Sequence, residues 1–66
     1  HGTVIFESSE AIESIQVFRI SGALVQSETP NTMRWMMDTT DWAEGIYVVR
    51  IQTATGTKSL KLVRGA

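Results

Sequence analysis

The sequence predicts an all-β protein, built as a small antiparallel sandwich or barrel. Short runs rich in Val, Ile, Thr, Trp and Tyr recur along the chain, and these residue types favour strands. Gly, Pro and Asn interrupt the runs at short intervals, as turns between strands require. No segment carries apolar residues at helical spacing over more than two turns. Short strands at such intervals are typical of sandwiches and small barrels.

The N-terminal third is expected to contain one strand and one loop. Residues 2–7 form the first expected strand, with Val4 and Phe6 on one face and Ile5 on the other. Residues 8–14 are mostly polar, so we expect a loop there, with a helical turn in its second half.

The next segment predicts a hairpin. Residues 15–20 carry apolar groups on both faces, which suits a central strand better than an edge strand. Ser21 and Gly22 follow, and Gly tolerates the positive φ that tight turns demand. We therefore expect residues 15–20 to pair with residues 23–26. Residues 28–32 hold the single Pro and are expected to form a loop.

The C-terminal half is expected to supply three more strands. In order, it contains a strand over residues 33–38, a polar connection that ends at Gly45, a strand over residues 46–53, a turn over residues 54–57 and a last strand over residues 58–64. The strand over residues 46–53 has the strongest alternation, with Tyr47, Val49 and Ile51 on one face.

The composition is that of one small globular domain. The 66 residues are 42% hydrophobic and 20% charged, with a net charge of -1. Because nucleic-acid binding needs a basic face, we expect no nucleic-acid partner. Cys is absent, so disulfides and Cys-ligated zinc are excluded. A chain of about 60 residues has little room for a deep pocket beside its core, so we expect no enzyme activity, cofactor or small-molecule substrate.

Three residues are candidates for acid–base or metal chemistry. His1 lies at the chain end, and we interpret it as a terminal or tag residue, because a general base needs an orienting partner. Asp38 and Asp41 could contribute to a calcium site, but their spacing lacks the pattern of a dedicated loop. We expect instead that Asp38 ends a strand and that Asp41 caps a turn by accepting backbone N–H bonds.

The aromatic residues leave two alternatives open. Trp35, Trp42 and Tyr47 could form a platform for sugar or peptide, or they could supply buried core area. We favour the core, with Tyr47 buried and Trp42 covering one end of the sandwich. The three methionines are expected to fill irregular space in the core or at an interface; they are Met33, Met36 and Met37.

Basic residues mark the last expected strand. Lys58, Lys61 and Arg64 recur every third residue, so they cannot all share a face of a strand. They indicate either an edge strand protected from aggregation by its charges or a basic tail that a receptor binds.

Three segments follow one another in a distinctive order. Residues 15–25 read IQVFRISGALV, a strand, a Gly turn and a second strand. Residues 41–51 read DWAEGIYVVRI, a loop that leads into Gly-x-Tyr and an apolar strand. Residues 57–64 read TKSLKLVR, a closing strand with a terminal basic residue. In this order the segments resemble the C-terminal sorting domains of the type IX secretion system, over residues 15–64.

The chain also departs from that family's pattern. The family usually opens with a strand that ends in Pro-Asn-Pro, which is absent before Gly2, and Pro30-Asn31 lies too late. We therefore expect residues 1–66 to be a single C-terminal domain, lacking its first strand, from a larger cargo protein. Gly65 and Ala66 extend beyond the basic residue at which the family normally ends.

The resemblance implies an Ig-like antiparallel sandwich of about six to seven short strands, which acts as a secretion address. The cargo would cross from the periplasm through the outer membrane, and a cell-surface sortase would then remove the domain, leaving the cargo at the surface or secreted. The implied partners are the translocon, shuttle and sortase components of the system. The expected recognition residues, most of them in the last strand, are Gly22, Gly45, Tyr47, Lys58, Leu60, Lys61, Leu62, Val63 and Arg64.

Physical reasoning from the residues adds two expectations. A terminal edge strand presents unpaired N–H and C=O groups, which strand addition by a receptor can use. An incomplete sandwich leaves an open edge, so we expect a homodimer, formed by strand exchange. The alternatives are an accessory Ig-like or fibronectin-like module that binds carbohydrate or protein through an exposed Trp35–Trp42 pair, and an enzyme fragment with titratable residues in a cleft.

Overall fold

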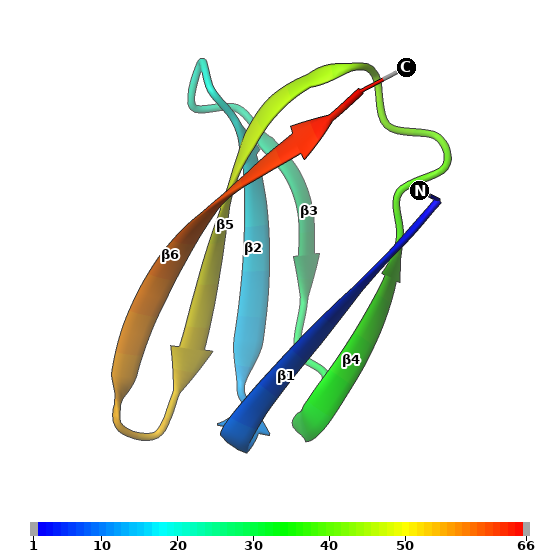
Figure 1. The fold of residues 1–66 in the computed structure, drawn as a ribbon. Helices are drawn as coiled ribbons and strands as arrows, with labels where there is room; N and C mark the ends of the chain where they lie inside the picture. Colours follow the sequence, from blue (N-terminus) through cyan, green and yellow to red (C-terminus); the bar gives the residue numbers. More distant parts are fainter. Residues whose placement is uncertain (1, 66) are drawn as a thin grey trace.

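The computed structural model describes residues 2–65 and confirms the all-β prediction (Figure 1). Within that range the strands are joined by turns and loops, and no helix is long and apolar enough to cross a membrane. The strands are β1 (Thr3–Ile12), β2 (Ser14–Arg19), β3 (Leu24–Glu28), β4 (Thr32–Asp38), β5 (Gly45–Thr53) and β6 (Gly56–Arg64).

The strands form two antiparallel sheets that face each other as two layers (Figure 1). The large sheet has the order β3-β2-β5-β6, and the small sheet pairs β1 with β4. As predicted, β2 is a central strand, it forms a hairpin with β3, and β6 is an edge strand. Gly22 closes the hairpin with a φ of 101°, a conformation that side chains with a Cβ rarely adopt.

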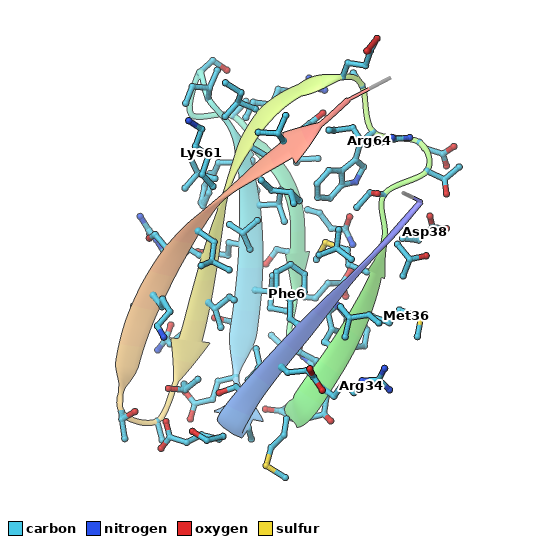
Figure 2. All side chains as sticks on the ribbon, viewed as in Figure 1. Phe6, Arg34, Met36, Asp38, Lys61 and Arg64 are labelled. Atoms are coloured by element: carbon cyan, nitrogen blue, oxygen red, sulfur yellow. The ribbon has the colours of Figure 1, made fainter. Side chains whose placement is uncertain are left out.

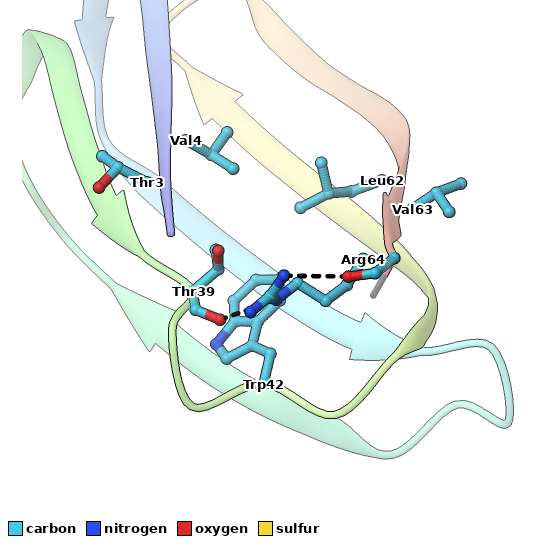
Figure 3. A pocket seen from close by; sticks show the side chains of 8 residues that line it. Thr3, Val4, Thr39, Trp42, Leu62, Val63 and Arg64 are labelled. Carbon is cyan, nitrogen blue, oxygen red and sulfur yellow. Dashed lines mark hydrogen bonds between the residues drawn. The ribbon is translucent and has the colours of Figure 1, made fainter. Parts of the chain in front are cut away.

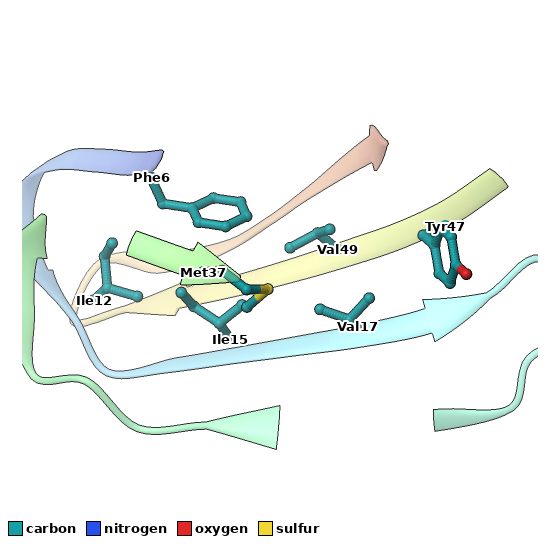
Figure 4. Close-up of a cluster of buried hydrophobic side chains, with 7 residues drawn as sticks. All are labelled: Phe6, Ile12, Ile15, Val17, Met37, Tyr47 and Val49. Carbon is teal, nitrogen blue, oxygen red and sulfur yellow. The ribbon is translucent and has the colours of Figure 1, made fainter. Parts of the chain in front are cut away.

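The core lies between the two layers and is supplied by alternate residues of four strands (Figure 4). Each such side chain stabilises the fold by roughly 1.5–3 kcal/mol relative to exposure. The buried side chains are Phe6 and Ile12 of β1, Ile15 and Val17 of β2, Met37 of β4, and Tyr47 and Val49 of β5. The predicted face of Tyr47 and Val49 is therefore confirmed.

The loop predicted over residues 8–14 is wrong, because β1 continues to Ile12, which is fully buried. Its ladder with β4 shifts register between Glu7 and Ile12, and the N–H of Asn31 donates to the Ile12 carbonyl at 2.9 Å. Glu10 accepts hydrogen bonds from the hydroxyls of Thr53 at 3.0 Å and Thr55 at 2.6 Å. Glu10 can thus occupy this strand because distant partners satisfy its carboxylate.

The two layers differ in width, and this leaves part of the large sheet uncovered. Leu60 of β6 pairs with Val49, whose side chain is fully buried on the inner face. Directly paired residues share a face, yet Leu60 is 42% exposed. The small sheet therefore covers β2 and β5 and leaves the inner face of β6 partly open.

Gly45 provides a test of the backbone at the start of β5. Its φ is 150°, a backbone conformation that residues with a Cβ rarely adopt. A Cβ built there would contact nothing within 4 Å, so a substitution would strain the backbone without a steric clash. We expect Gly45→Val to lower the free energy of unfolding by about 1–3 kcal/mol, measured by urea denaturation. Gly65→Ala is the matched control, since Gly65 also has open space but no positive φ. Equal midpoints for the two variants would contradict the backbone role.

Candidate recognition site at the C-terminal strand

The unpaired edge of β6 is the main feature of the candidate site. One side of β6 pairs with β5 along its whole length, from Gly45 opposite Arg64 to Thr53 opposite Gly56. Within residues 2–65 no strand pairs with its other side, so a row of backbone N–H and C=O groups faces outward there. An extended chain from a partner could add to this edge.

The predicted recognition residues of β6 divide between its two faces. On the inner face, Leu62 is half-buried against the core, whereas Lys58 is exposed. On the outer face, Lys61 is exposed and Val63 is 66% exposed. The expectation that the three basic residues do not share a face is confirmed, because Lys61 lies opposite Val48 on the outer face.

Arg64 joins the end of β6 to the loop that follows β4 (Figure 3). Its Nε donates to the Thr39 carbonyl at 3.2 Å, and its guanidinium also donates to the Thr40 carbonyl at 3.5 Å. A further bond, at 3.1 Å, reaches the Gly65 carbonyl. These bonds link an edge of the large sheet to the chain leaving the small sheet.

A shallow pocket of about 280 Å³ lies beside this junction (Figure 3). It is lined by Thr3, Val4, Thr39, Trp42, Leu62, Val63, Arg64 and Gly65. Its wall therefore combines the start of β1 with the end of β6, two segments that lie far apart in the sequence.

The loop between β4 and β5 is ordered by hydrogen bonds within it and to residues outside it. The N–H of Thr39 donates to the Gly2 carbonyl at 2.8 Å, and the N–H of Trp42 donates to the Thr39 carbonyl at 3.0 Å. The Tyr47 hydroxyl donates to the Ala43 carbonyl at 2.5 Å. Tyr47 is 2% exposed, so it holds this loop from within the core and presents almost no surface.

The aromatic residues belong to the core, as predicted. Trp42 lies on Tyr47 with ring centroids 4.7 Å apart and covers one end of the sandwich. Trp35 lies on β4 opposite Phe6, and it is half-buried against the same core. The two Trp rings therefore do not form the exposed pair that the carbohydrate-binding alternative requires.

The methionines behave differently from one another. Met37 is buried in the core, as expected. Met33 and Met36 are each 57% exposed. The expectation of core or interface packing is thus confirmed for Met37 alone.

Asp38, and not the predicted Asp41, caps the turn after β4. The Oδ1 of Asp38 accepts hydrogen bonds from the Thr40 hydroxyl at 2.6 Å and from the Thr40 N–H at 2.9 Å. These bonds lower the pKa of Asp38, the side-chain bond most strongly. In the part of the chain described, no three His, Cys, Asp or Glu side chains gather as metal ligands. His1 lies outside the described residues.

The contact between Arg64 and the Thr39 carbonyl was not predicted from the sequence. Thr39 is 1% exposed, an unusual burial for a Thr in a polar loop. A backbone carbonyl carries no residue-specific signal, so the sequence offers only the terminal basic residue as a hint.

The Asp38 cap predicts a dependence of stability on pH. The pKa of Asp38 is lower in the folded chain than its ordinary value of 3.8. The stabilisation that the ionised Asp38 carboxylate contributes is therefore complete above that value, and it is lost as pH falls through the folded pKa. We expect the free energy of unfolding to decrease on acidification into this range, and Asp38→Asn to reduce the decrease.

Urea denaturation over a pH series measures this effect. Thr40→Val removes the hydroxyl donor and keeps the backbone donor, so its pH dependence should lie between those of the parent and Asp38→Asn. Identical curves for the parent and Asp38→Asn would contradict the cap.

Comparison with known proteins identifies a family for this chain. A family model described as a secretion system C-terminal sorting domain matches residues 1–64. No curated protein and no solved structure matches the chain. The match extends the resemblance seen over residues 15–64 to the first residue. The chain therefore belongs to the family of C-terminal sorting domains of the type IX secretion system.

Proposed function

We propose that this domain directs its cargo through the outer membrane by offering β6 to the secretion machinery as an added strand. Family membership supports a sorting signal. The observation that carries the finer proposal is the open edge of β6, which ends the described chain with one side unpaired. Strand addition supplies affinity through backbone hydrogen bonds, and neighbouring side chains supply specificity.

The side chains of β6 support a strand that stays available until a partner binds. Lys58 and Lys61 are exposed, and charges on an edge strand oppose pairing with unintended chains. Leu60 and Val63 are apolar and exposed on opposite faces of the strand. A partner strand could therefore bury an apolar side chain on each face while it pairs with the backbone.

Arg64 is proposed to position the end of this strand. Its bonds to the carbonyls of Thr39 and Thr40 hold the last residues of β6 against the β4–β5 loop. Without them, the end of an edge strand with one partner would fray. In this proposal Gly22, Gly45 and Tyr47 act indirectly, because they shape the hairpin and the loop that support β6.

The later steps of export are part of the same proposal. The translocon and shuttle components would bind the domain during passage from the periplasm. A sortase would then cut it from the cargo, which stays at the surface or is released. The domain itself would do no chemistry, and it acts as a folded address that the machinery recognises and removes.

We also propose that the isolated domain forms a homodimer through an open strand edge, by strand exchange. Size-exclusion chromatography with light scattering over a dilution series should show a dimer. Leu60→Lys adds a charge beside the exposed edge and should weaken the dimer. Gln52→Lys, on the outer face of the central strand β5, is the control, because it adds the same charge away from every sheet edge. A stable monomer at every concentration would contradict the dimer.

An export assay tests the sorting function. Residues 1–66 are fused to the C-terminus of a fluorescent passenger with a periplasmic signal, in a bacterium that has a type IX system. We expect surface fluorescence for the full domain and its loss on truncation after Leu60. Every fully buried core residue precedes that cut, so the truncated domain should retain its core.

The control for the truncation is removal of Gly65 and Ala66 alone, which leaves Arg64 in place. This shorter deletion should export like the full domain. Export of the chain truncated after Leu60 at full efficiency would show that β6 is not the address.

A further inference from the structure

The outer face of the large sheet is apolar at one end and polar at the other. Register identifies the residues that share this face, because directly paired residues in antiparallel strands lie side by side. Leu24 pairs with Phe18, Phe18 pairs with Val48, and Ile46 pairs with Val63. The polar end holds Ser14, Gln16, Ser27, Gln52, Thr57 and Ser59.

The apolar end crosses all four strands and is exposed. Ile20 follows β2 and its N–H donates to the Ile46 carbonyl at 3.2 Å, which places it beside the apolar residues of β5. We call the six residues the outer apolar patch; its members are Phe18, Ile20, Leu24, Ile46, Val48 and Val63. Ile20 is 70% exposed, Val63 66%, Leu24 55% and Ile46 39%. Contiguous exposed apolar groups on a small domain mark an interaction surface.

The charges on this face are of one sign. Arg50 lies over the Phe18 ring, with its guanidinium carbon 5.6 Å from the ring centroid. Lys61 lies opposite Val48 and next to Val63 on β6. None of the strand residues that register places on this face is acidic, although the whole chain has a net charge of -1.

We propose that the outer apolar patch, with Arg50 and Lys61, is a second docking surface for a protein partner that presents apolar and acidic side chains. The inference rests on the proposed sorting function and deepens it. The machinery would contact the domain across a whole sheet face as well as along the β6 edge. The patch reaches β6 through Val63, so both contacts can belong to one partner surface.

Charge favours an acidic protein partner for this patch over a second copy of the chain or an anionic membrane. A second copy docked patch to patch would bring Arg50 and Lys61 against their own equivalents, and like charges in an interface oppose binding. An anionic membrane attracts basic clusters of about 4–8 residues, whereas this face carries Arg50 and Lys61 alone among its register-placed residues. A protein surface with acidic and apolar side chains complements both the apolar patch and its two basic side chains.

The decisive variants lie outside β6. They therefore test the outer apolar patch without changing the open edge of β6. The double substitution Ile20→Ser, Leu24→Ser removes two of the most exposed apolar groups of the patch. We expect it to reduce surface arrival of the fluorescent passenger about tenfold, as truncation at an interface centre does. The matched control is Ile5→Ser, Met36→Ser, a paired and similarly exposed set on the outer face of the small sheet. Figure 2 shows Met36 projecting there, on the side away from Phe6.

A charge series tests the acidic nature of the partner. Arg50→Glu should reduce export, whereas Arg50→Lys, which keeps the charge, should retain it. Thermal unfolding of each purified domain should give the same midpoint as the parent, because all these side chains are substantially exposed or point outward.

The outcomes distinguish failure of this inference from failure of the sorting function. If the Ile20 and Leu24 variant exports like the parent while truncation after Leu60 abolishes export, the second surface is wrong and the sorting function stands. If the parent fusion itself is not exported, the sorting function fails. If the parent sediments with phosphatidylglycerol vesicles and the Ile20 and Leu24 variant does not, the face binds lipid, and the protein-partner inference is overturned.

Discussion

The contact between two sheets of unequal width is the constraint on which the rest of this structure depends. Two strands, β1 and β4, bury the middle of a four-stranded sheet, and the seven buried apolar side chains lie in that overlap. A chain this short has no other large core to draw on. The outermost strand β6 therefore receives less cover than β2 and β5, which leaves Leu60 exposed on a face that would otherwise be buried.

This arrangement is compatible with the proposed use of β6 as the part of the sorting signal that a partner binds. The fully buried apolar side chains all precede β6, and Leu62 of β6 packs against them from the side. Arg64 compensates for the thin cover by bonding to the Thr39 carbonyl across the layers. The strand is thus held in register at its end while its outer edge stays available, a combination that suits strand addition.

The unequal widths of the two sheets also explain why the two faces of the large sheet differ. The inner face of β2 and β5 is committed to the core, so a further contact with a partner can use an edge, the open inner face of β6 or the outer face. On the outer face the apolar groups gather at the end where β6 finishes, and the polar groups gather at the other end. The edge and the patch meet at Val63, so under the proposed scheme a single partner would engage both.

The sequence by itself determined the all-β class, the hairpin at Gly22, the central place of β2 and the burial of Tyr47, because alternation and turn chemistry act over a few residues. Only the tertiary structure decided that β1 runs to Ile12, since Glu10 finds its hydroxyl partners 43 and 45 residues along the chain. It likewise decided the bond from Arg64 to the Thr39 carbonyl and the gathering of the outer patch. These features depend on which strands become neighbours, and such long-range pairing leaves no local pattern in the sequence.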